Sequence, residues 1–253
     1  MPAGLAQHAA DFFVLAARDG KTRLAVETYV GESYVQHNHR VPDGPEGFRK
    51  RYHDMSHDYG YRDVAVIRSF ASADTAVLHT LEDRGDGGVW VGMVLLRFVD
   101  DKVVEQWDNY AEVADLTAGL AAVSGPAAVS TLESTDDTAN RATETIRALV
   151  ANQPMSAAPG FDHRKFRHHD NGEASRTFAA EWFENRDDLE ITTIHQVVAH
   201  HSFALVQSEG RIGDTPTAFT DLFRCEQGLI IEHWGIAENI ASTTDSAHSN
   251  GKF

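Results

Sequence analysis

The chain has 253 residues, enough for one large domain or two of about 125, and its 42% hydrophobic content is that of an ordinary globular protein. The formal net charge of −16 argues against a nucleic-acid partner, because like charges repel. Cys225 is the single cysteine, so no internal disulfide forms, and no apolar run reaches the roughly 20 residues that span a bilayer. We expect a cytoplasmic protein with no membrane partner.

Helices come first in the chain. Apolar residues at helical spacing predict helices at 5–18, 21–30 and 46–55, with a short extended piece at 34–38. From residue 61 the period changes to two, and four strands are predicted at 64–69, 75–82, 89–99 and 103–110. Helices followed by strands joined through short turns indicate an α+β fold, with a curved, mainly antiparallel sheet wrapped around the helices.

The second half repeats this order. Helices are predicted at 138–150 and 174–184, an extended piece at 161–169, and strands at 191–199, 201–208, 216–225 and 229–236. Residues 116–137 are rich in Ala, Ser and Thr, which is typical of a linker. We therefore predict domains at 1–120 and 137–240, a linker at 121–136 and a disordered tail at 241–253.

A hairpin near the middle of the chain recurs near its end. The sequence RFVDDKVVEQWDNY at 97–110 is matched by RCEQGLIIEHWGI at 224–236, with the two tryptophans 127 residues apart. His37 matches His169 at a spacing of 132. Three residues of the hairpin recur and are interpreted as parts of the fold: Arg97 as Arg224, Glu105 as Glu232, and Trp107 as Trp234. Asp108 does not recur, because Gly235 stands in its place, and that difference makes Asp108 the candidate for function.

Two motifs of the first half resemble a known family. YVQHN followed by PDGPEG at 34–47, and the hairpin at 98–108, resemble bacterial SnoaL-like polyketide cyclases, within the nuclear-transport-factor-two-like or ketosteroid-isomerase-like superfamily. The resemblance covers about residues 5–113, and over 138–239 it rests mainly on the closing hairpin. It implies two tandem cone-shaped domains, each with an apolar pocket, packed as an internal pseudo-dimer. A homodimer of the whole chain is a further expectation.

Asp108 is the predicted general acid or base. A strand alternates faces, so Val104, Gln106 and Asp108 are expected on one face and Trp107 on the other. A carboxylate in an apolar pocket is desolvated, which suits it to proton transfer near neutral pH. The resemblance implies the acid/base of an intramolecular aldol closure that needs no metal or cofactor. The alternative is an aspartate at a strand end, exposed to water.

An enolate formed by such a reaction needs a hydrogen-bond donor near its oxygen. The candidates are His79, in the middle of a predicted strand, and His37, Gln36 and Asn38. The family carries a pocket histidine on a strand shortly before the aspartate, but residues 89–99 have none. For His37 the sequence favours a structural role. The predicted catalytic set is Asp108, His79 and His37, and the predicted substrate-binding set is Tyr34, Gln36, Asn38, Trp90, Gln106 and Tyr110.

The predicted second domain, 137–240, carries seven of the 14 histidines. Two pairs, at 168–169 and 200–201, are adjacent in sequence, and adjacent side chains of a strand face opposite ways, so no metal site is predicted. Cys225 is expected to be buried and unreactive. Gly235 in place of the aspartate indicates that the second half lost catalysis or never had it. The expected role of the second half is to pack against the first.

Two functions remain open, and a third is possible in this fold. The first is a small-molecule enzyme, an aldol-type cyclase, isomerase or hydratase, that transfers protons at Asp108 without a cofactor. The second is a non-catalytic protein that binds a small apolar or polyketide-like molecule. The third is an epoxide-opening hydrolase. An enzyme requires a buried Asp108 with a donor opposite, whereas a binding protein tolerates Asp108 in water.

Overall fold

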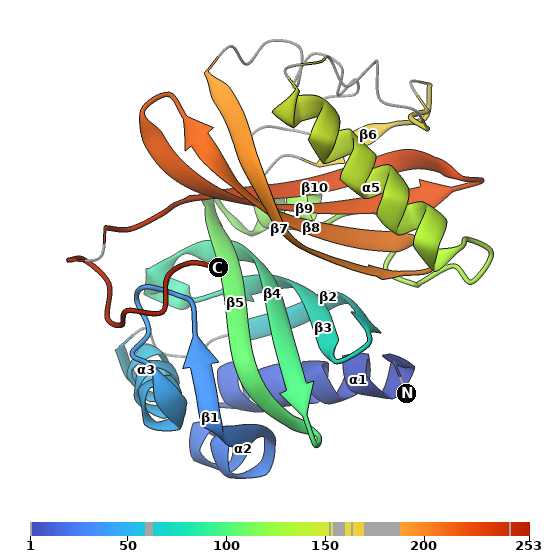
Figure 1. The fold of residues 1–253 in the computed structure, drawn as a ribbon. Helices are drawn as coiled ribbons and strands as arrows, with labels where there is room; N and C mark the ends of the chain where they lie inside the picture. The colour runs from blue at the N-terminus through green and yellow to red at the C-terminus, as the bar shows by residue number, and fades with distance from the viewer. Residues whose placement is uncertain are drawn as a thin grey trace. The chain divides into compact units, whose positions relative to one another are not determined.

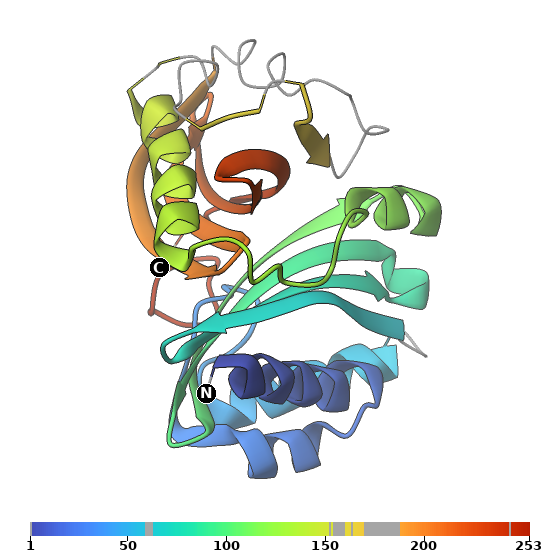
Figure 2. The same cartoon turned by 90° about the vertical axis from the view of Figure 1, so that its right-hand side faces the viewer.

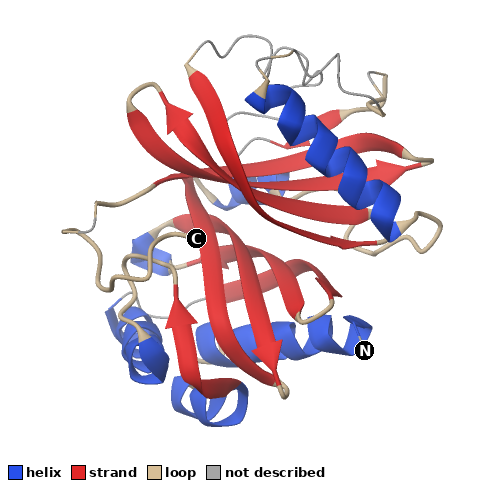
Figure 3. Ribbon diagram, in the orientation of Figure 1, coloured by secondary structure: helices blue, strands red, loops and turns tan. Residues whose placement is uncertain are grey.

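The computed structural model describes residues 2–58, 63–151, 153, 160–162, 164–169, 188–242 and 244–253. The chain divides into two compact units, Met1–Gly119 together with Ala241–Phe253, and Leu120–Ile240 (Figure 1). Each unit holds one five-stranded sheet with helix packed against it (Figure 3). The expected α+β class is confirmed. No helix in the described ranges is long and apolar enough to cross a membrane.

The first unit packs helices α1 to α3 with a sheet of strand order β1-β5-β4-β3-β2, and α4 begins in the first unit and ends in the second. Strands β1 and β5 are parallel and the other neighbours are antiparallel, as the hairpin turns predict. The helices are α1 (Pro2–Phe13, continued by a π-helical turn Val14–Arg18), α2 (Thr22–Tyr29), α3 (Gly44–Asp58) and α4 (Leu116–Ala122). The strands are β1 (Val30–Gln36), β2 (Asp63–Ser72), β3 (Thr75–Asp83), β4 (Val89–Val99) and β5 (Lys102–Val113), with a 3₁₀ turn at Gly85–Gly87.

Helices of the first unit cover one face of this sheet (Figure 2). Their aromatic side chains belong to the core on that face. Phe12 of α1 stacks on Phe48 of α3, with 5.2 Å between ring centroids. Leu78 of β3 and Val94 of β4 are fully buried in the same core. Since Leu78 pairs with Val94, and Val94 pairs with Asp108 of β5, Asp108 lies on the helix-covered face.

The second unit repeats the strand order as β6-β10-β9-β8-β7, again with one parallel pair, β6 with β10. Helix α5 packs on its sheet (Figure 2). Ala142 and Ile146 of α5 share a core with Phe219 and Phe223 of β9. The hydroxyl of Ser134 accepts from the backbone N–H of Asp137 and caps this helix. The elements are α5 (Thr135–Val150), β6 (Arg167–His169), β7 (Leu189–His200), β8 (Phe203–Ile212), β9 (Thr215–Glu226) and β10 (Leu229–Asn239).

The hairpin motif has the same geometry in both units. Asp100 and Asp101 have positive φ angles of 49° and 61°, and Gln227 and Gly228 have 56° and 72°. Two consecutive positive φ angles are those of the tight turns that join twisted strands. After each turn the last strand carries a β-bulge.

The bulge after Val103 changes one predicted position. The partners of β4 jump from Val103 to Glu105, so Val104 is the extra residue. Val103 is therefore the residue in the core, with an exposed fraction of 0%, and the prediction that Val104 shares the face of Asp108 is wrong. The prediction holds for Gln106, which lies beyond the bulge.

The connecting segments differ most from expectation. Helix α4 lies partly in the predicted linker, and α5 begins inside it at Thr135. The helix predicted at 174–184 and the position of His163 lie outside the described residues. Residues 241–253, predicted as a disordered tail, instead belong to the first unit, where Lys252 is 8% exposed.

Candidate functional site

Asp108 lies buried among amide groups, with 2% of its surface exposed. Its Oδ1 accepts a hydrogen bond from Nδ2 of Asn38 at 2.5 Å, and its Oδ2 accepts one from Nε2 of Gln106 at 2.8 Å. Asn38 follows β1, and Gln106 precedes Asp108 by two residues on the same face of β5. The structure thus brings two predicted binding residues onto the predicted acid/base.

A chain of hydrogen bonds continues from Gln106 to β1. The hydroxyl of Tyr34 donates to Oε1 of Gln106 at 3.0 Å and accepts from Nε2 of Gln36 at 2.7 Å. Burial, and then the negative charge of Tyr52, Asp108 and Asp43, raises the pKa of Tyr34 well above its ordinary value. Tyr34 therefore remains a neutral donor at physiological pH.

The turn after β1 fixes Asn38. Its Oδ1 accepts the backbone N–H of Arg40, while the Oε1 of Gln36 accepts the backbone N–H groups of His37 and Asn38. Burial opposes ionisation of Asp43, but hydrogen bonds, first from the backbone N–H of Gln36, hold the pKa of Asp43 below its usual value. An amide locked at both ends has little freedom to leave Asp108.

The C-terminal segment also contacts this site. Nζ of Lys252 donates to the backbone carbonyl of Asp108 at 2.7 Å. Nδ2 of Asn250 donates to the carbonyl of Gln36 at 3.0 Å, and Nε2 of His248 lies 3.0 Å from the carbonyl of Asn38. The sequence offered no sign of these contacts, because more than 140 residues separate Lys252 from Asp108.

The two predicted catalytic histidines do not share the face of Asp108. His79 pairs with Met93, one residue out of step with the row that contains Asp108, so it lies on the opposite face of the sheet. Its Nδ1 is 3.1 Å from Nη1 of Arg68, on neighbouring strand β2. The structure therefore does not bring His79 together with Asp108 as the predicted catalytic set requires.

His37 stacks on Trp107, also on the opposite face. Its Nε2 is 3.0 Å from Oε1 of Glu105, whose other oxygen binds Arg97. The second unit has the same cluster, with His169 stacked on Trp234 and bonded to Glu232. Equivalent residues in both halves support the structural role that the sequence favoured for His37.

Tyr110 lies two residues along β5 from Asp108, Trp90 lies four residues along β4 from Val94, and both contact a buried ion pair. The guanidinium of Arg84 lies 4.7 Å from the ring centroid of Trp90 and 5.0 Å from that of Tyr110. Arg84 also binds Glu82, whose side chain is fully buried. A side chain at Gly92 would meet the Tyr110 ring at 2.4 Å, which explains the glycine. Glu82 and Arg84 were not among the residues predicted from the sequence.

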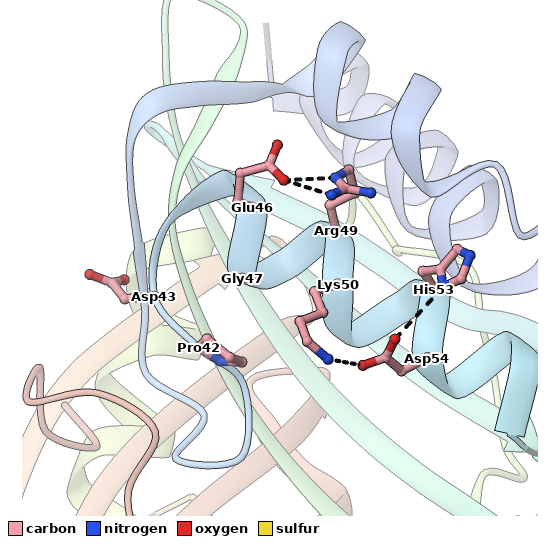
Figure 4. Close-up of a pocket in the computed structure, with 8 residues that line it drawn as sticks. All are labelled: Pro42, Asp43, Glu46, Gly47, Arg49, Lys50, His53 and Asp54. Carbon is pink, nitrogen blue, oxygen red and sulfur yellow. Dashed lines mark hydrogen bonds and ion pairs between the residues drawn. The ribbon is translucent and has the colours of Figure 1, made fainter.

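A pocket of about 480 Å³ lies on the outer side of α3 and does not include Asp108 among its lining residues (Figure 4). It carries Glu46 paired with Arg49, and Lys50 paired with Asp54, all of them substantially exposed. Ion pairs at helical spacing on a solvated face are common surface features. This pocket is therefore not where the chemistry of Asp108 would occur.

Cys225 is buried, as expected from the sequence. Burial raises the pKa of the Cys225 thiol to about 11, so it stays protonated. His200 and His201 lie at the β7–β8 turn, where His201 has a positive φ of 50°. Within the described residues, no three His, Cys, Asp or Glu side chains are placed to hold a metal ion.

No protein-family model and no curated protein matches the chain. Solved structures do. TsrD from Streptomyces laurentii is 16% identical, with a TM-score of 0.38, over 42% of this chain and 88% of that one. A candidate polyketide cyclase from Bacillus cereus is 15% identical, with a TM-score of 0.38, over 42% and 73%. A candidate ketosteroid isomerase from Kribbella flavida is 12% identical, with a TM-score of 0.37, over 44% and 84%. At these values the matches assign no activity.

Proposed function

We propose that the chain is a small-molecule enzyme that moves a proton with Asp108, in an aldol-type cyclisation, isomerisation or hydration without a cofactor. The observation that carries the proposal is the carboxylate of Asp108, buried on the helix-covered face and held by two amides. Amides do not titrate, and Tyr34 stays protonated. Asp108 is thus the group in this hydrogen-bonded chain that can exchange a proton.

The geometry supports the two steps of such a reaction, removal of a proton and binding of the enolate oxygen. The carboxylate of Asp108 is the general base of the proposal, which takes a proton from the carbon next to a substrate carbonyl. The NH₂ groups of Asn38 and Gln106 each have a second hydrogen, for which the described residues provide no acceptor. These hydrogens could bind the enolate oxygen, replacing the histidine that the resemblance led us to expect.

The substrate class follows from the surroundings. Beyond the amides that hold Asp108, this face is apolar: Val94 and Leu78 lie in the row of Asp108, and Phe48 and Tyr52 stack on each other in the same core. We therefore propose an apolar carbonyl compound, such as a polyketide-like chain or ring, as the substrate. The net charge of −16 would repel a polyanionic ligand.

The test uses 2-tetralone, an apolar ketone, and follows exchange of its α-hydrogens into D₂O by NMR. We expect Asp108→Asn to remove the exchange that depends on Asp108, a loss on the order of 100-fold for a general base. Asp101→Asn is the matched control, because Asp101 is exposed in a turn and asparagine tolerates its positive φ. Equal rates in wild type and Asp108→Asn would refute the proposal.

Binding of 2-tetralone without any exchange would instead favour the non-catalytic alternative. The present geometry argues against that alternative, because a binding protein has no need of a buried carboxylate, which costs free energy to desolvate. Chemical-shift changes of the protein on titration with 2-tetralone distinguish binding from its absence. The same assay therefore separates the two functions.

A further inference from the structure

A second pocket, of about 530 Å³, lies within the second unit, where residues before β6 meet β9 and β10. Pockets of this size commonly bind small molecules. Its charged lining side chains are four cations, Arg164, Lys165, Arg167 and Arg224, and two carboxylates, Glu226 and Glu232. The pocket is therefore locally positive, although the chain has a net charge of −16.

Both carboxylates of this pocket are already paired with Arg224. Glu232 binds Nε of Arg224, and Oε2 of Glu226 lies 3.2 Å from Nη1 of Arg224. The other three cations are exposed, and their side chains make no ion pair or hydrogen bond with any residue that the structure describes. Like charges gathered on one wall repel one another, so an anion bound among them would be stabilised.

The pocket on α3 provides the contrast. Its Arg49 pairs with Glu46 and its Lys50 pairs with Asp54 (Figure 4). These cations are neutralised by partners one turn away on the same helix. The pocket of the second unit differs because three of its cations are left for a ligand.

The backbone fixes the segment that carries these three cations. Its end pairs with β10 through Arg167, and its start forms a bridge to β10 at Phe161. Between them, Oδ1 of Asp162 accepts the backbone N–H groups of Arg164 and Lys165, at 3.0 and 3.2 Å. Because this backbone is already ordered, a ligand would not have to supply the free energy of ordering it.

The first unit shows that the fold does not require the three cations. Val35 of β1 stands at the place of Arg167 of β6, since the two residues pair with the equivalent glutamates of β5 and β10. Counted back along the chain from Val35, Glu32 and Ser33 take the places of the other two cations. The first unit thus builds the same parallel strand pair without positive charge there, and the cations are an addition of the second unit.

We propose that this pocket binds a small organic phosphate, a monoester whose phosphate lies among Arg164, Lys165 and Arg167. The ester's apolar body would lie against Pro126 and Ile231, which also line the pocket. Guanidinium groups bind phosphate oxygens through paired N–H donors, and a lysine adds a point charge. Three cations suit a phosphate dianion better than a carboxylate, which carries a single charge.

The net charge of the chain does not prevent this binding. At physiological ionic strength, charges more than about 8 Å apart are largely screened, so the cations next to the ligand dominate. A long polyanion would extend beyond the pocket and meet the negative surface, whereas a monoester would not. The site is independent of Asp108 and does not rest on the enzyme proposed above.

The experiment titrates the full chain with 1-naphthyl phosphate in a calorimeter. Arg167→Gln and Lys165→Gln should each weaken binding on the order of tenfold, because each removes a charged hydrogen-bond donor. Both side chains are exposed, so these variants are expected to fold. Arg147→Gln is the matched control, since Arg147 is an exposed arginine of α5 outside the pocket lining and its loss changes the net charge equally.

Two further ligands test the two parts of the monoester. 1-Naphthol has the same ring without the phosphate, and inorganic phosphate has the charge without the ring, so each should bind on the order of tenfold more weakly or worse. Equal binding of 1-naphthol would overturn recognition of the anion. Equal binding of inorganic phosphate would overturn recognition of the apolar body.

Amide chemical shifts locate the binding. Titration with 1-naphthyl phosphate should move the amide signals of residues 164–167 and of β10. No binding, or binding that is unchanged when Arg164, Lys165 and Arg167 are all replaced by Gln, would overturn the site. Exchange of 2-tetralone is measured on the same variants, so that failure of this site is distinguished from failure of the Asp108 site.

Discussion

The imidazole of His37 lies flat on the indole of Trp107, with 4.9 Å between ring centroids and 12° between ring planes. His169 lies on Trp234 with nearly the same values, 4.8 Å and 8°. In each unit the histidine joins the short parallel strand to the last strand, through the stack and through a glutamate. These contacts hold the edge strand, β1 or β6, beside the last strand of its sheet. In the first unit, the turn that follows this edge strand carries Asn38.

His37→Ala should therefore destabilise the first unit without acting on the chemistry of Asp108. Loss of the stack and of the bond to Glu105 is expected to cost about 1–3 kcal/mol of unfolding free energy. Urea unfolding followed by tryptophan fluorescence would measure it. A stable His37→Ala protein that has lost 2-tetralone exchange would contradict this view and assign His37 to catalysis.

His169→Ala provides the matched comparison in the second unit. The same contacts are removed there, so a loss of similar size is expected. Hydrogen exchange of the β10 amides would locate the effect. A loss spread equally over the strands of the first unit would contradict a local role.

Tyr34→Phe tests the hydrogen-bonded chain from β1 to Asp108. Removal of the hydroxyl leaves Oε1 of Gln106 without that donor and should cost about 1–2 kcal/mol at pH 7. The raised pKa of Tyr34 means that its stabilisation is complete below pH 10 and is lost as pH rises through the folded-state pKa. Unfolding free energies at pH 7 to 11 should therefore fall less steeply for Tyr34→Phe than for wild type. Parallel curves would contradict the assignment.

The sequence predicted much of the fold because the signals were local. The strand predicted at 89–99 is β4 without change, and the repeated hairpin carries its turn residues in both copies. The same hairpin put Asp108 and Gln106 on one face, as alternation requires beyond the bulge. At Val104 alternation failed, because a bulge is set by the pairing of two strands and leaves no mark in one.

The site was predicted less well, because its contacts join distant residues. His79 lies in a strand whose two faces are both buried, so its neighbours gave no sign of the face it occupies. His168 and His233 meet only through the pairing of β6 and β10, 65 residues apart. Asp221 was not predicted from the sequence, because it lies on β9 and reaches His233 across the pairing of β9 with β10. Comparison of sequence positions does not show which side chains of neighbouring strands meet.

Glu232→Gln tests the buried cluster of the second unit by its dependence on pH. Burial opposes ionisation, but His169 and Arg224 outweigh it and hold the pKa of Glu232 below its ordinary value of 4.5. A lowered pKa stabilises the fold above the unfolded value, and this contribution is lost as pH falls through the folded value. The variant should be less stable by about 1–3 kcal/mol at pH 7, with a smaller difference at pH 3. A difference that grows in acid would contradict the sign.

Removal of residues 241–253 tests whether the C-terminal segment supports the Asp108 site. The segment donates from Lys252 to the carbonyl of Asp108 and from Asn250 to that of Gln36, and two such bonds are worth about 2–3 kcal/mol. The truncated chain should lose hydrogen-exchange protection in β1 and the end of β5 while β7–β9 remain protected. Lys252→Met, which keeps the aliphatic stem, should reproduce part of that loss, about 1–2 kcal/mol, because it removes only the charged donor. Unchanged protection in β1 after truncation would mean that the segment rests on the unit without stabilising it. Slower 2-tetralone exchange in a truncated chain of normal stability would show that the segment positions Asp108.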